Sequence, residues 1–137
     1  ASDLSAAKDD QQRLALCRKF MTQWPDDYFY QAACLRKIVS IQEAKALEDL
    51  MPALSSSNEI LHESAVSLAA ELPKVGTDHW IGQLAQAKGR GLAGILDLLA
   101  RRRDPKALQS IQPYLTAEDP LVREAATRAV AAIDETP

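Results

Sequence analysis

Two adjacent residues, His62 and Glu63, have the types and the spacing of a metal-binding pair on a helix. Imidazole nitrogen and carboxylate oxygen are common ligands of zinc and iron, but a metal site needs several such groups together. The only other histidine, His79, has no glutamate after it. The sequence therefore predicts no metal and no cofactor, and we expect His62 to be a partly exposed helix residue.

A second pattern with chemical meaning is the glycine spacing at Gly89, Gly91 and Gly94. It matches the dinucleotide-binding loop, but that loop requires a preceding strand, and here the preceding residues have helical periodicity. We interpret Gly89 and Gly91 as a turn between helices and Gly94 as a point of close packing. The alternative is a phosphate or carboxylate bound at this helix N-terminus beside Arg90.

Residues 88–106 contain six basic side chains against Asp97 and Asp104, a local net charge of +4 in a chain whose net charge is -3. Part of the run Arg101-Arg102-Arg103 complements the negative C-terminal end of its helix, which favours a solvated helix end. If the run has a function, an acidic protein surface suits it better than DNA. A duplex-binding repeat protein is expected to spread positive charge along several helix pairs.

The aromatic residues, only 5% of the chain, gather around one break between helices, at Trp24, Tyr28, Phe29 and Tyr30. Trp and Tyr are frequent anchors of protein interfaces. In a repeat protein they could equally cap the open end of the stack, so both interpretations stand.

The two cysteines, Cys17 and Cys34, lie at nearly equal distances on either side of the same break. If the flanking segments form an antiparallel helix pair, the two sulfur atoms lie at the same height and a disulfide is geometrically allowed. It would close a loop of about 16 residues, contribute roughly 3 kcal/mol and indicate an oxidising compartment such as the bacterial periplasm. The alternative is two buried thiols, with a cytoplasmic location left open.

Helical periodicity runs through nearly the whole chain, which predicts an all-α protein. Helix pairs are expected at about 8–41, 43–72, 77–103 and 105–133, with residues 1–7 frayed. Serine three residues before glutamate predicts helix starts at Ser40 and Ser56, and Asp-Pro predicts starts at Asp104 and Asp119. No apolar run approaches the roughly 20 residues of a membrane span. Nucleophile, CxxC and Walker motifs are absent from the sequence.

An internal repeat is the most informative feature of the sequence. Residues 61–69 align with residues 122–130, an offset of 61 residues. Half of that offset, about 31 residues, brings residues 94–99 near the same register, and a further step aligns Cys34 with Ala65. A fixed period of this length predicts a solenoid, in which each helix pair buries its apolar face only against its neighbours.

Residues 119–133 carry a family resemblance. They combine an Asp119-Pro120 start, an apolar residue and Arg123 in the first turn, and small alanines that allow adjacent helices to approach closely. This pattern resembles the second helix of a short, bacterial type of HEAT-like repeat, and residues 43–72 are similar to it. The resemblance implies a right-handed α-solenoid of about four antiparallel helix pairs, forming one domain over residues 1–137.

HEAT-like proteins are mainly scaffolds, so the resemblance implies a non-enzymatic module that binds another protein. His62-Glu63 resembles one His-Glu pair of deoxyhypusine hydroxylase, a HEAT-like enzyme that gathers several such pairs around two irons, and one pair does not supply that set. A scaffold, an adaptor and an inhibitor of the immunity type all fit, and nucleic-acid binding through residues 88–106 is the alternative. Further surface positions expected from periodicity are Arg36, Lys37, Glu59, Glu63 and Ser67. The candidate partner-binding residues are Trp24, Tyr28, Arg90, Arg101, Arg102, Arg103, Arg123 and Arg128.

Overall fold

The computed structural model of the chain describes residues 2–72 and 74–134, with side chains described from residue 9 onward. Every regular element in these ranges is helical, so the predicted all-α class is confirmed. The α-helices are α1 (Ser2–Gln23), α2 (Tyr28–Gln42), α3 (Leu47–Leu54), α4 (Glu59–Ala70), α5 (Thr77–Leu84), α6 (Gly89–Arg102), α7 (Leu108–Ile111) and α8 (Pro120–Asp134). Short 3-10 helices occupy Glu43–Ala46, Pro105–Ala107 and Gln112–Thr116. Among the described helices, none has the length and apolar character that crossing a bilayer requires.

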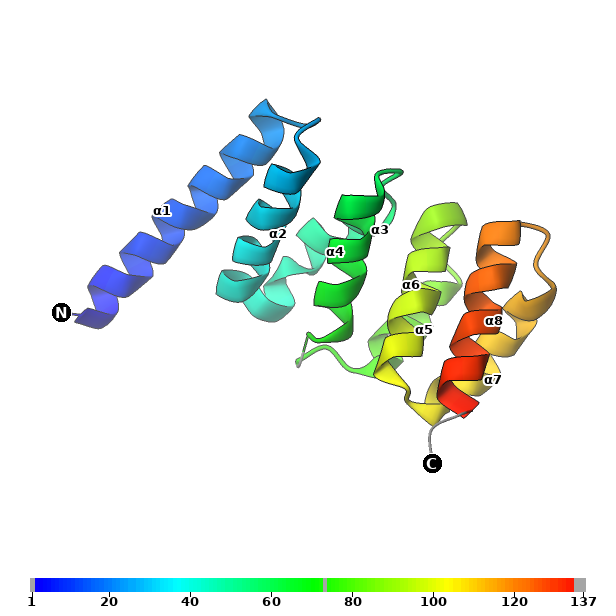
Figure 1. Ribbon diagram of the computed structural model, residues 1–137. Helices are drawn as coiled ribbons and strands as arrows, with labels where there is room; N and C mark the ends of the chain where they lie inside the picture. Colours follow the sequence, from blue (N-terminus) through cyan, green and yellow to red (C-terminus); the bar gives the residue numbers. More distant parts are fainter. Residues whose placement is uncertain (1, 73, 135–137) are drawn as a thin grey trace.

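Helices α2, α4, α6 and α8 stand side by side in a row and run in the same direction, with α3, α5 and α7 behind them (Figure 1). Each helix of the row packs against the next one. Helix α1 packs on α2 in the opposite direction, at the N-terminal end of the row. The arrangement leaves one side of α4, α6 and α8 exposed, and that side carries the candidate site.

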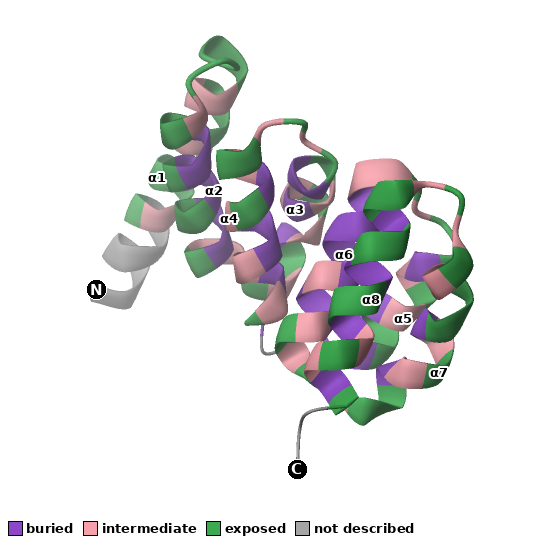
Figure 2. Cartoon of the chain, turned by 45° about the vertical axis from the view of Figure 1, so that its right-hand side comes forward, coloured by how far each residue is buried: buried purple, intermediate pink, exposed green. Residues whose placement is uncertain are grey.

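The core is one cluster of apolar side chains that extends from Leu14 to Ile133. Helix α6 lies at its centre and is buried on nearly every side, because it packs against α4 and α8 in the row and against α3 and α5 behind it (Figure 2). Three alanines of α8, Ala125, Ala126 and Ala129, are fully buried. Such small side chains allow neighbouring helix axes to approach closely.

Both predicted Asp-Pro helix starts are present. The Asp104 carboxylate accepts a hydrogen bond from the backbone N–H of Lys106 at 3.1 Å, and Asp119 accepts one from Leu121 at 3.0 Å. Each aspartate thereby satisfies a backbone donor that the first helical turn leaves unpaired, and the proline that follows has no donor to satisfy.

Two predicted capping boxes are wrong. Ser40 lies inside α2, where its hydroxyl donates to the carbonyl of Lys37 at 2.7 Å, and Glu43 ends that helix with a φ of 51°. At the start of α4 the cap is Asn58 rather than Ser56, because the Asn58 side chain accepts from the backbone N–H groups of Ile60 and Leu61. In both places another hydrogen bond replaces the one that the local pattern predicts.

Two helix boundaries also differ from those expected. The first helix begins at Ser2, so residues 2–7 are helical rather than frayed, and residue 1 lies outside the described residues. The segment 105–116 is broken into α7 and two 3-10 turns, one of which carries Pro113. Proline lacks a backbone donor and clashes with the preceding turn, which explains why no single helix spans this segment.

Candidate functional site

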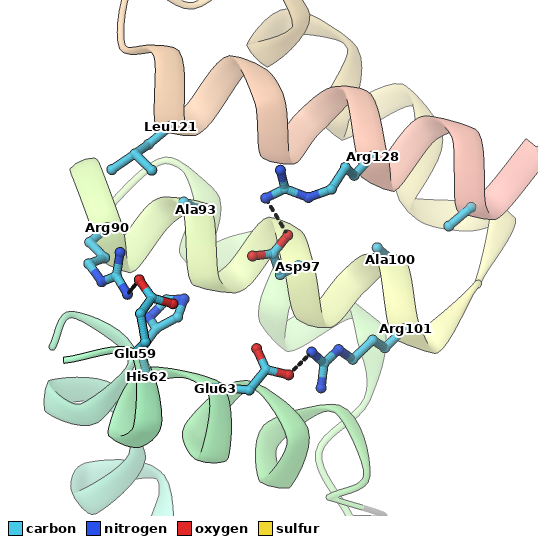
Figure 3. A pocket seen from close by; sticks show the side chains of 11 residues that line it. Glu59, His62, Glu63, Arg90, Ala93, Asp97, Ala100, Arg101, Leu121 and Arg128 are labelled. Carbon is cyan, nitrogen blue, oxygen red and sulfur yellow. Dashed lines mark hydrogen bonds and ion pairs between the residues drawn. The ribbon is translucent and has the colours of Figure 1, made fainter. Parts of the chain in front are cut away.

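The exposed side of α4, α6 and α8 contains a hollow of about 470 Å³, which we call the charged hollow (Figure 3). Helix α4 contributes its first two turns, α6 its exposed edge, and α8 the residues that face α6. The lining residues are Glu59, His62, Glu63, Arg90, Ala93, Asp97, Ala100, Arg101, Leu121, Arg128 and Ala132.

Three ion pairs cross the charged hollow, each between neighbouring helices. Arg90 pairs with Glu59, and Arg101 pairs with Glu63, both between α6 and α4. Arg128 of α8 pairs with Asp97 of α6 at 3.1 Å.

The two arginines paired with α4 also bind that part of the chain through further bonds. Arg90 Nε donates to the carbonyl of Ser56, and Arg101 donates to the hydroxyl of Ser67 at 2.6 Å. The hollow therefore presents both signs of charge, held in place by bonds between helices.

In two of these three pairs one member is well exposed, because the Glu59 side chain is 78% exposed and the Arg128 side chain 59%, whereas their partners Arg90 and Asp97 are 21% and 25% exposed. Exposed ion pairs contribute about 0–1 kcal/mol each to stability. The charged hollow therefore keeps charges of both signs accessible from solvent.

His62 lies on the floor of the charged hollow and is buried, so the expectation of partial exposure is wrong. Its Nδ1 is 2.8 Å from the carbonyl oxygen of Leu54. Because a carbonyl only accepts, Nδ1 carries the hydrogen and donates it. Among the residues described, no group of three His, Cys, Asp or Glu side chains is placed to hold a metal ion. His79 is far along the chain on α5, where its ring packs edge-on against Trp80.

The three glycines lie in α6 itself, and α5 rather than a strand precedes them. The expectation of a turn between helices at Gly89 and Gly91 is therefore wrong, because both residues lie in the first turn of α6. A Cβ atom on Gly91 would lie 2.6 Å from the Ser55 hydroxyl, and one on Gly94 would lie 3.1 Å from the His62 ring. These glycines allow α6 to pack closely against the end of α3 and against α4. Arg90, the residue expected beside a bound anion, already donates to Ser56 and Glu59.

The basic stretch 88–106 does not form one patch in the structure. Arg90 and Arg101 lie in the charged hollow, and Lys106 pairs with Asp78 at 3.5 Å. Arg103 ends α6 in the left-handed conformation, with a φ of 53°. Three of the six cations therefore have acidic partners on other elements, and these partners compensate part of the local charge of +4.

Arg102 has a structural position that its sequence neighbours do not share. Its Nη2 donates to the carbonyls of Ala69, Leu72 and Val75, at 3.3, 3.1 and 2.7 Å. Burial lowers the pKa of Arg102, while Asp104 opposes that shift. This side chain ties the end of α4 and the following link to the end of α6, and it does not line the charged hollow.

The remaining candidates lie outside the charged hollow. Trp24 is half-exposed at the end of α1, with its ring centroid 5.2 Å from that of Phe20, while Tyr28 begins α2 and is half-buried. Arg123 donates to the carbonyl of Ala117 at 3.0 Å, at the base of α8. The structure thus brings together Arg90, Arg101 and Arg128 but separates them from the aromatic candidates.

Cys17 and Cys34 face each other across α1 and α2 as free thiols, near to one another but not at bonding distance. The disulfide is therefore not formed in this structure, and of the two thiols that the alternative expects to be buried, Cys34 is buried and Cys17 is half-buried. Burial, reinforced by Cys17, raises the pKa of the Cys34 thiol to about 11. Cys34 is consequently held in its protonated thiol form at neutral pH.

The site residue that sequence reasoning missed is Asp97, which entered only as a charge to be counted. A usable signal was present, since Asp97 and Arg128 are separated by 31 residues, as are Glu59 and Arg90. This separation equals the period of the apolar repeat. Comparison of the chain with protein-family models, with curated proteins and with solved structures gave no significant match.

Proposed function

We propose that this chain is a non-enzymatic protein-interaction module that binds a partner protein in the charged hollow. The observation that carries the proposal is the set of three exposed ion pairs across α4, α6 and α8, in a concave surface of about 470 Å³. A surface with both signs of charge at fixed positions suits a folded protein with complementary charges.

A HEAT-like repeat stack is the architecture that we propose for this module. Its support is the separation of 31 residues in three ion pairs that join different helices, namely Arg18 with Asp49, Glu59 with Arg90 and Asp97 with Arg128. The contacts between successive row helices and the buried alanines of α8 agree with this architecture. In repeat proteins the exposed face of one helix series is the usual binding surface.

Nucleic-acid binding through residues 88–106 is the weaker alternative. Phosphate binding requires cations that are free to replace counterions. Here Arg90, Arg101 and Lys106 have acidic partners, and Arg102 is bonded to backbone carbonyls. Binding of a DNA duplex at low ionic strength that weakens with added salt, and that depends on Lys88 and Arg103, would favour this alternative.

Site-specific photo-crosslinking tests the proposed function. A benzoylphenylalanine in place of Leu121, which lines the charged hollow and is exposed, should crosslink a discrete partner in source cells. The same group in place of Gln109, an exposed residue of α7, is the matched control. Arg128→Ala should reduce the Leu121 crosslink about tenfold, whereas Arg123→Ala on the same helix should not. Equal products from both positions, or a crosslink that ignores Arg128, would overturn the proposal.

A further inference from the structure

The large apolar side chains that remain exposed are concentrated on α1 and α2. Leu16 is 49% exposed, Trp24 50% and Phe29 75%. The rings of Phe20, Trp24 and Tyr30 contact one another with centroids 5.2 to 6.5 Å apart. Exposed apolar surface gathered in one place marks an interaction site in soluble proteins.

A groove of about 350 Å³ runs between these two helices, and we call it the α1–α2 groove. Its lining is largely apolar and consists of Arg13, Leu16, Cys17, Phe20, Tyr30, Ala33, Cys34 and Lys37. On each helix the lining residues recur every three or four positions along about two turns, so the groove follows the helix axes for roughly 10 Å. A trough between two antiparallel helices has the shape that a third helix fills.

The charged side chains that line the α1–α2 groove have no acidic partner within its lining, unlike those of the charged hollow. Arg13 and Lys37 line it, and no acidic residue does. Asp10, one turn before Arg13 on the same helix, lies 3.7 Å from Arg13, and both side chains are about half-exposed. Within the described residues, Lys37 has no ion-pair partner, and neither does Arg36 beside it. The groove therefore combines an apolar floor with positively charged edges.

We propose that the α1–α2 groove binds an amphipathic helix of a partner protein, whose apolar stripe is flanked by Asp or Glu. The apolar stripe covers Leu16, Phe20 and Tyr30, and the carboxylates face Arg13 and Lys37. An anionic membrane would meet the same charges, but the apolar side chains Leu16, Phe20 and Tyr30 line a trough along two helices, which is the shape that a third helix fills. The α1–α2 groove is separate from the charged hollow, and the inference stands whether or not the hollow binds a partner.

Selection from a displayed library of amphipathic helical peptides with randomised flanking positions tests this inference on the whole chain. Enriched peptides should carry acidic residues beside the apolar stripe. As purified peptides they should slow the alkylation of Cys17, which lines the groove and is half-buried. Their binding should also change the tryptophan fluorescence, since Trp24 contacts Phe20 and Tyr30 of the groove. The change can be assigned to Trp24, because the other tryptophan, Trp80, is fully buried in the core.

Charge variants separate this site from any other surface. The double variant Arg13→Glu with Lys37→Glu should weaken a selected acidic peptide at least about tenfold and accept its Lys-flanked counterpart. Lys88→Glu reverses a positive charge outside the groove, at the start of α6, and should leave the affinity for the selected peptide unchanged. Leu16→Glu changes a half-exposed side chain, so it should block the groove while helix content is retained.

Three results would overturn the inference. The first is a selection that enriches no helix, or enriches helices with no acidic bias. The second is a set of selected peptides that leave Cys17 unprotected, since their site then lies elsewhere. The third is co-sedimentation of the chain with phosphatidylglycerol vesicles that Leu16→Glu abolishes, which would assign the groove to a membrane surface.

Discussion

The three consecutive arginines at the end of α6 should respond to substitution in three different ways. Arg101 lies in the charged hollow with its side chain 41% exposed, Arg102 donates to three backbone carbonyls, and Arg103 has a φ of 53°. Sequence alone treats these residues alike, so the difference between their variants measures what the fold adds.

Arg102→Ala should destabilise the chain by about 3 kcal/mol. Hydrogen bonds from a charged donor are worth about 1.5–3 kcal/mol each, and one NH₂ group has two hydrogens, so the bonds to Val75 and Leu72 dominate. The longer bond to Ala69, at 3.3 Å, is shared. Water that enters the space left by the side chain can bond to the freed carbonyls, which recovers part of the lost free energy of unfolding. For a chain of 137 residues, a loss of this size lowers Tm by about 10 °C.

The neighbouring variants are the internal controls. Arg101→Ala removes an exposed ion pair and should cost no more than about 1 kcal/mol, or about 3 °C. Arg103→Gly relieves a left-handed backbone conformation and should stabilise the chain by up to about 1 kcal/mol, reduced by the loss of a positive charge at a helix C-terminus. Arg102→Lys keeps the charge and should fall between wild type and Arg102→Ala.

Thermal and urea unfolding followed by far-ultraviolet circular dichroism would measure all four variants on the same scale. If Arg101→Ala and Arg102→Ala lower Tm equally, the bonds between Arg102 and the end of α4 do not stabilise the fold. If Arg102→Ala fails to fold, the Arg102→Lys value still decides the matter, because a Tm equal to that of wild type would refute the reasoning.

Gly94→Ala should destabilise the chain by about 0.5–2 kcal/mol, because its Cβ would press on His62 and Leu54 and this overpacking outweighs the gain of about 0.5–1 kcal/mol that alanine has over glycine in a helix. Gly82→Ala, with nothing within 4 Å of the added Cβ, should stabilise the chain by about 0.5–1 kcal/mol. Unfolding midpoints of the two variants compare these effects directly. Burial raises the pKa of Cys34 from 9.0 to about 11, so the folded chain holds this proton more tightly than the unfolded chain. The resulting stability is complete below pH 9 and is lost as the pH rises through about 11. Comparing the free energy of unfolding of wild type and Cys34→Ala as a function of pH measures this contribution of Cys34. An identical pH dependence in the two proteins would contradict the raised pKa of Cys34. At pH 8 an alkylating reagent should modify Cys17 before Cys34, which should react only on unfolding, as peptide mass spectrometry would show.

The fold could be predicted where one local interaction decides the outcome. An aspartate before proline has few competing conformations, and both Asp104 and Asp119 begin a helix as expected. The pattern at Ser40 failed because it lies within a helix that Ile38 and Val39 already anchor in the core. There the hydroxyl finds a carbonyl of the preceding turn, which a local pattern cannot distinguish from a cap.

The helical periodicity of the sequence could predict much of the residue content of the charged hollow, but it could not predict which residues form ion pairs with one another. Arg90, Arg101 and Arg128 lie on the exposed side of their helices, which helical spacing reports. The partner of each arginine lies on a different helix, so it depends on how the helices stack. His62 shows the same limit, because its burial depends on the Leu54 carbonyl and on the space left by Gly94.

The cross-helix ion pairs have a role that their small energies do not suggest. Glu59 with Arg90 and Asp97 with Arg128 join successive row helices at the same separation of 31 residues. A slip of α6 by one turn, about 5.4 Å, would break both pairs at once and would place a larger side chain where Gly94 contacts His62 and Leu54. The pairs therefore favour the same register as the close packing of Gly94 on His62 and Leu54. Because each arginine is already oriented by its partner, a binding protein does not have to order these side chains, which lowers the entropic cost of association.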